Sequence, residues 1–132
     1  MNKDKLPLVK KDAKYSLAQL KRALDYLEKD PKAHDRDILL DAVAKRFEMS
    51  FEYMWKALKA ASEFQGTEAP GPRPAITNAI TYGWIKNPEI WITFLEARNS
   101  GVHDYHDFDP ESYAQIAREF LKESTAVVKR LP

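Results

Sequence analysis

Residues 37–64 read DILLDAVAKRFEMSFEYMWKALKAASEF, and this segment carries the longest helical pattern in the chain. Apolar side chains recur in it every three or four residues, and it contains neither proline nor glycine. This spacing places the apolar side chains on one face of an α-helix. The face consists of Leu40, Val43, Phe47, Phe51, Met54 and Leu58. The pattern therefore predicts a long helix that ends near Phe64, with Asp35 or Asp37 as its N-cap.

Helical patterns also lie on both sides of this segment. Before it, four leucines share one face of a helix that Asp30-Pro31 ends. These leucines are Leu17, Leu20, Leu24 and Leu27. After it, residues 66–74 (GTEAPGPRP) hold three prolines and two glycines, which predict a loop. A shorter helix is expected after Pro74, because apolar residues again recur at helical spacing. They are Ile76, Ile80 and Trp84.

Two further helices have clear start signals. Asn87-Pro88 and Asp109-Pro110 each place a capping residue before a proline, which suits the first helical position. Each signal is followed by an apolar face. The first face holds Trp91, Phe94, Leu95, Arg98 and Val102, and the second holds Tyr113, Ile116, Ala117, Phe120, Val127 and Leu131. The pattern predicts an all-α, up-and-down antiparallel bundle of four to five helices.

The composition narrows the class of protein further. The chain has 132 residues, which suits a single domain over residues 1–132, and its lysine-rich residues 1–11 are expected to be flexible. It has no cysteine, which removes disulfides and thiolate chemistry and suits the cytoplasm. No secretory signal or membrane-spanning run is recognisable, so no membrane partner is expected. A net charge of +1 means that any contact with nucleic acid must be local.

Arg98 is the first residue that conflicts with the helical pattern. It falls in the middle of an apolar face, where a guanidinium must leave the core, find a partner or meet another surface. His103 follows five residues later, about 140° around an ideal helix, and fraying or a turn at Gly101 could bring the two side chains together. Such conflicts tend to mark functional sites.

An arginine and a histidine suit metal-independent cleavage of RNA. Histidine exchanges protons near neutral pH, and arginine stabilises the charge that builds on a phosphate. The RNA itself supplies the nucleophile through its 2′-hydroxyl group. From spacing alone, however, an arginine reaching solvent and a solvated histidine explain the same residues more simply.

Two segments resemble a known family. Residues 46–56 (RFEMSFEYMWK) are similar to the second-helix signature of nucleotidyltransferase substrate-binding proteins, which belong to the HEPN superfamily. Residues 91–105, with LEARN at 95–99 followed by His103 and Tyr105, resemble the second signature of that family. The resemblance covers nearly the whole chain, from about Leu17 to Leu131, with both motifs in the right order.

The resemblance implies a function and a set of site residues. It implies a homodimer encoded beside a minimal nucleotidyltransferase (MNT), with the pair acting as toxin and antitoxin. The toxin is an endoribonuclease that needs no cofactor or metal, with Arg98 and His103 as catalytic residues and Asn99 in support. Tyr105 is the position onto which the partner transfers AMP, which silences the nuclease. A candidate polar network of Arg46, Glu48 and Glu52 is expected near the site.

Other interpretations of these residues remain open. The chain could be a non-catalytic subunit that presents substrate or nucleotide to the nucleotidyltransferase, or a helical adaptor without activity. His103, Asp104, His106 and Asp107 could bind a metal, although a solvated acidic loop is the commoner use of such residues. Asp104 and Asp107 would repel RNA phosphates. Trp55, Trp84 and Trp91 are expected in the core or at a dimer contact.

Overall fold

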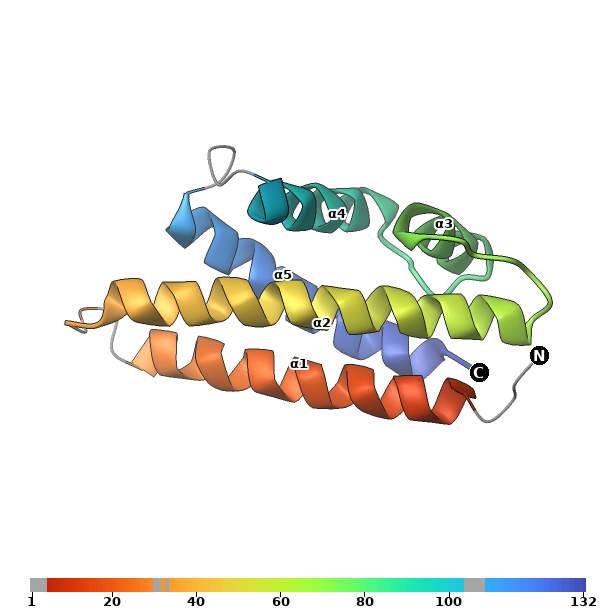
Figure 1. Ribbon diagram of the computed structural model, residues 1–132, viewed down its shortest axis with the longest axis horizontal. Coiled ribbons are helices and arrows are strands. Elements are labelled where there is room, and N and C mark those ends of the chain that lie inside the picture. The colour runs from red at the N-terminus through yellow and green to blue at the C-terminus, as the bar shows by residue number, and fades with distance from the viewer. Residues whose placement is uncertain (1–4, 30–31, 33, 104–108) are drawn as a thin grey trace.

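The computed structural model describes residues 5–29, 32, 34–103 and 109–132, except for the side chains of residues 101–103. The described residues form five α-helices and no strand, which confirms the predicted all-α class (Figure 1). The helices are α1 (Lys5–Lys29), α2 (Arg36–Phe64), α3 (Pro72–Thr81), α4 (Pro88–His103) and α5 (Pro110–Arg130). Helix α2 contacts each of the other four, so the long predicted helix is the centre of the bundle.

The long helices alternate in direction, as Figure 1 shows. Helices α1 and α2 run antiparallel side by side, and α4 returns along α2 before α5 reverses the chain again. The start of α1 lies beside the end of α5, where Lys10 Nζ donates a hydrogen bond to the Pro132 carbonyl oxygen at 3.0 Å. The end of α4 and the start of α5 lie at the opposite end of the bundle (Figure 1).

The predicted helix starts are confirmed for α4 and α5. Helix α4 begins at Pro88 and α5 at Pro110. The Asp109 carboxylate caps α5, because Oδ1 accepts a hydrogen bond from the Ser112 backbone N–H at 2.9 Å. Asp35 occupies the N-cap position of α2, but its side chain makes no capping hydrogen bond.

Two boundaries differ from the sequence prediction. The expected flexible segment 1–11 is wrong from Lys5 onward, because α1 already begins there and Leu6 is buried in the core. The expected loop 66–74 is too long, because α3 begins at Pro72. Both Pro72 and Pro74 lie in the first turn of α3, where a missing N–H costs no helical hydrogen bond.

An aromatic cluster joins α2, α4 and α5 in the core. The ring of Phe120 on α5 lies 5.1 Å from Phe47 and 6.0 Å from Phe51, both on α2. It also lies 5.2 Å from Phe94 and 5.8 Å from Trp91, both on α4. All five side chains are less than 2 % exposed, and most of these ring pairs meet edge to face, a favourable arrangement for aromatic rings.

None of the described helices combines the length and the apolar content that crossing a bilayer requires. The expected core role of two tryptophans is confirmed, since Trp84 and Trp91 are buried. Trp55 is only half-buried, and its indole N–H contacts a carboxylate described below.

The Phe120→Ala substitution should lower the free energy of unfolding by about 3–5 kcal/mol, because it removes the ring that four others contact and leaves a cavity. Urea unfolding followed by circular dichroism measures this change. Leu8→Ala is the control, since Leu8 is 63% exposed and its loss should cost no more than about 0.5 kcal/mol. Equal losses for the two variants would contradict the proposed role of the cluster.

Candidate functional site

Arg98 lies on α4 and reaches across to α2. Its Nη2 donates a hydrogen bond to Glu52 Oε1, and its Nη1 donates to Asn99 Oδ1 at 3.3 Å. The Arg98 side chain is 27% exposed and that of Glu52 is 33% exposed, so the ion pair lies at the surface between the two helices. The conflict in the apolar face of α4 is thus relieved by a guanidinium that leaves the core and meets a carboxylate.

Glu52 also accepts a hydrogen bond from a residue of its own helix. The indole N–H of Trp55 donates to Glu52 Oε2 at 3.0 Å, so both carboxylate oxygens accept hydrogen bonds. Trp55, Glu52, Arg98 and Asn99 therefore form a continuous chain of polar contacts from α2 to α4. The sequence suggested Glu52 as part of a polar network but did not identify Arg98 as its partner.

The other members of the candidate network lie elsewhere. Arg46 points to α1, where its Nη1 donates to the Gln19 carbonyl oxygen at 2.7 Å. Glu48 lines a surface cavity of about 440 Å³ between α2 and the start of α5, together with Asp109 and Tyr113. Its Oε1 atom is buried and has no hydrogen-bond partner among the described residues. The structure thus brings Glu52, but neither Arg46 nor Glu48, into contact with Arg98.

His103 is the last residue of α4, five positions after Arg98 on the same helix. Helix α4 continues through Gly101, so the turn considered there is not present. The side chain of His103 is outside the described part of the structure, so the convergence of Arg98 and His103 stays a prediction. Tyr105 lies outside the described residues, as do Asp104, His106 and Asp107. Within the described residues, no group of three or more histidine, cysteine or acidic side chains could hold a metal ion.

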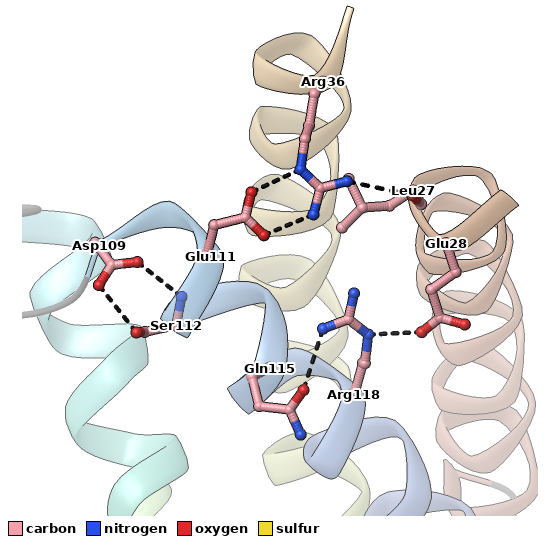
Figure 2. Close-up of polar contacts among 8 residues, drawn as sticks. All are labelled: Leu27, Glu28, Arg36, Asp109, Glu111, Ser112, Gln115 and Arg118. Atoms are coloured by element: carbon pink, nitrogen blue, oxygen red, sulfur yellow. Dashed lines mark hydrogen bonds and ion pairs between the residues drawn. The ribbon is translucent and has the colours of Figure 1, made fainter. Parts of the chain in front are cut away.

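Helix α5, which follows Tyr105 in the sequence, has a firmly attached first turn. Arg36, at the beginning of α2, forms a bidentate ion pair with Glu111 at the beginning of α5 (Figure 2). The two nitrogen–oxygen distances are 2.6 and 2.7 Å. A third contact runs from Arg36 Nη1 to the Leu27 carbonyl oxygen of α1, at 3.4 Å. Three helices are thus joined at this end of the bundle. Arg118 on α5 adds an ion pair to Glu28 on α1 at 2.6 Å (Figure 2).

These contacts change the acidity of the groups involved. The hydrogen bonds from Arg36 lower the pKa of Glu111, and the hydrogen bond to Glu111 raises the pKa of Arg36. The backbone N–H and the hydroxyl of Ser112 lower the pKa of Asp109. Asp109 and Glu111 are exposed and Arg36 is half-buried, so salt partly screens their interactions. The main effect of the cluster is to fix the direction in which the chain enters α5.

In the described part of the chain, four long helices and one short helix define a small helical-bundle protein with a partly exposed ion pair between α2 and α4. Its residues 11–132 match a family described as nucleotidyltransferase substrate binding protein like. The chain belongs to this family, which confirms the resemblance seen in the sequence.

A comparison with solved structures supports the same fold. A crystal structure of a protein from Thermus thermophilus is similar, with a TM-score of 0.66 and 25% sequence identity. The similarity covers 84% of this chain and 97% of that one. A search of curated proteins found no match.

The Glu111→Gln variant should show a pH-dependent loss of stability. Because the folded state lowers the pKa of Glu111, the ionised carboxylate favours folding above its ordinary pKa of about 4.3. This contribution disappears as the pH falls through the lower pKa of the folded state. The difference in unfolding free energy between wild type and variant should therefore be present at pH 7 and shrink toward pH 3.

Urea unfolding at a series of pH values measures this difference. Glu96→Gln is the control, because Glu96 is an exposed carboxylate on α4, away from the cluster at the start of α5. A wild-type advantage over Glu111→Gln that stays constant between pH 7 and pH 3 would rule out the ion pair as its cause.

Proposed function

We propose that this chain is the ribonuclease member of a pair with a nucleotidyltransferase, and that Arg98 and His103 carry out the cleavage. The observation that supports it most is the position of Arg98. Its guanidinium is at the surface rather than in the core, it is fixed by a partner helix, and it lies on the helix that ends at His103.

The proposed reaction uses the nucleophile within RNA. The 2′-hydroxyl oxygen attacks the neighbouring phosphorus, and His103 accepts the hydroxyl proton. The bond between phosphorus and the 5′-oxygen breaks, and that oxygen takes up a proton from the histidine of a second copy. The products are a 2′,3′-cyclic phosphate and a 5′-hydroxyl group. Arg98 stabilises the negative charge on the non-bridging phosphate oxygens during the transfer.

A homodimer would bring together at the site the positive charge that one copy alone lacks. The chain has a net charge of only +1, and Glu52 offsets the charge of Arg98 locally. A two-fold contact between copies would place two arginines and two histidines around one cleft, which concentrates positive charge where the RNA backbone binds. Asn99 accepts a hydrogen bond from Arg98 and supports the site from the same helix.

Tyr105 connects the ribonuclease to its partner. In the proposed regulation, the phenolic oxygen of Tyr105 attacks the α-phosphorus of ATP on the nucleotidyltransferase, and pyrophosphate leaves. The AMP group adds bulk and negative charge close to Arg98 and His103 in the sequence, which would exclude RNA by size and by repulsion. The family description, which names substrate binding to a nucleotidyltransferase, supports a partner of this class.

The same description also favours a second candidate function. As a non-catalytic subunit, the chain would present substrate or nucleotide to the nucleotidyltransferase without cleaving RNA. Asp104 and Asp107, which flank Tyr105, fit this alternative because they would repel an RNA backbone. It predicts a stable complex with the partner and no RNA turnover.

The purified protein without its partner should degrade RNA. Arg98→Ala and His103→Ala should each lower the rate at least about 100-fold, the contribution typical of a general acid–base group or a charge-stabilising donor. Gel analysis of a fluorescent RNA oligonucleotide measures the rate.

Arg73→Ala and His34→Ala are the matched controls, because both residues are exposed and neither belongs to the proposed site. Both controls should cleave at the wild-type rate. Undiminished cleavage by His103→Ala, or an inactive wild-type protein that still binds its partner, would favour the non-catalytic alternative.

Coexpression with the nucleotidyltransferase and ATP should attach AMP to Tyr105. The intact mass should rise by whole AMP units, and the modified protein should lose its ribonuclease activity. Tyr105→Phe should keep the unmodified mass and remain active under the same conditions, since it lacks only the phenolic oxygen. AMP on the Tyr105→Phe protein would show that another residue is the acceptor.

A further inference from the structure

The Glu52 carboxylate lies between two fixed donors. Oε2 accepts the indole N–H of Trp55 at 3.0 Å, and Oε1 accepts Nη2 of Arg98. Trp55 follows three residues later on α2, so this first contact joins two positions of one rigid helix. The other carboxylate oxygen of Glu52, Oε1, is thereby directed toward α4, where Arg98 contacts it.

Arg98 has more donors than its contacts with the described residues use. A guanidinium carries five N–H groups in one plane. Among the described residues, Glu52 engages Nη2 and Asn99 engages Nη1. The remaining donors can meet the oxygens of a phosphate, while the contact with Glu52 limits the rotamers of a long and otherwise flexible side chain.

We propose that Glu52 is a positioning residue for Arg98, and that Trp55 fixes Glu52 for this task. The inference rests on the proposed function, because it assigns Glu52 a role in that site. A carboxylate beside the guanidinium weakens the attraction of the site for an anion. Its benefit must therefore appear in the alignment of Arg98 with the reacting phosphate rather than in the strength of RNA binding.

Glu52→Gln is the decisive variant. Glutamine replaces one carboxylate oxygen with an NH2 group that only donates, so one of the two contacts that the separate oxygens make with Trp55 and Arg98 is lost. The turnover number kcat should fall about 10- to 100-fold, the size expected from misplacement of a catalytic group. The KM for RNA should stay the same or decrease, because the substitution removes a negative charge. Trp55→Phe, which keeps an aromatic ring but loses the N–H, should lower kcat by about fivefold.

Glu96→Gln is the matched control on the side of α4. It removes one negative charge two residues before Arg98, and Glu96 is exposed. It should change neither kcat nor KM. Thermal unfolding of each variant shows whether the fold is kept, so that lower kcat in a folded Glu52→Gln protein reports on the site. Unchanged or faster cleavage by Glu52→Gln, or a fall in rate caused only by a higher KM, would overturn the inference.

A second measurement does not depend on RNA cleavage. Nitrogen-15 NMR of the arginine side chains should give separate, slowly exchanging Nη resonances for Arg98 in the wild type, and averaged resonances in Glu52→Gln. Arg73, which is exposed, provides the averaged reference. If the wild type does not cleave RNA, the proposed function fails, and the Arg98 resonances still decide whether Glu52 holds the guanidinium. Averaged Arg98 resonances in the wild type would contradict the positioning role.

Discussion

The packing of Phe120 among four other rings places the helices that form the site. Phe120 comes from α5, and its neighbours come from α2 and α4, so one side chain fixes three helices against one another. Protein cores are close-packed and resist small shifts. Helix α4 therefore lies against α2 in one register, and that register brings Arg98 beside Glu52. The polar site at the surface is a consequence of the aromatic core beneath it.

The positive charge of Arg98 is offset by the neighbouring Glu52, and the whole molecule adds little net charge. With a net charge of +1, the chain has no excess of positive charge to attract RNA over a distance. Arg98 is paired with Glu52, and Glu52 is held by Trp55. This arrangement favours accurate placement of one guanidinium over strong binding. In the proposed dimer, a second copy would bring its own Arg98 and His103 to the same cleft.

The sequence predicts the helices better than it predicts the contacts between them. Asn87-Pro88 and Asp109-Pro110 mark the starts of α4 and α5 correctly, because each capping residue and proline is followed by an apolar repeat at helical spacing. The start of α1 is missed because the surrounding lysines favour a solvated tail, although Leu6, Val9 and Ala13 continue the apolar repeat of the helix. Pro72 is assigned to a loop, since a proline in the first turn of a helix looks the same in sequence as one in a loop.

In the candidate site, too, the sequence identifies a residue but not the contact that it makes. Arg98 is recognisable from the sequence alone, because a charged side chain within an apolar face must reach solvent or pair with another group. Its partner Glu52 lies 46 residues away, and only the packing of α4 on α2 reveals the pair. Arg46 and Glu48 are close to Glu52 in sequence, yet Arg46 contacts α1 and Glu48 lines a separate cavity. Arg46 lies on a different side of α2 from Glu52, whereas Glu48 lies one turn before Glu52 on the same side. Only the position of α4 along α2 shows that Arg98 contacts Glu52 and not Glu48.

The most direct test of the proposed ribonuclease is the cleavage of a DNA strand that contains a single ribonucleotide, in the presence of EDTA. The proposed chemistry predicts one cut, directly after the ribonucleotide, with a 2′,3′-cyclic phosphate on one product and a 5′-hydroxyl group on the other. The same strand with a 2′-O-methyl group at that position should stay intact. Cutting at deoxyribonucleotides, or cutting of the methylated strand, would contradict a mechanism in which Arg98 and His103 act on an RNA-supplied nucleophile.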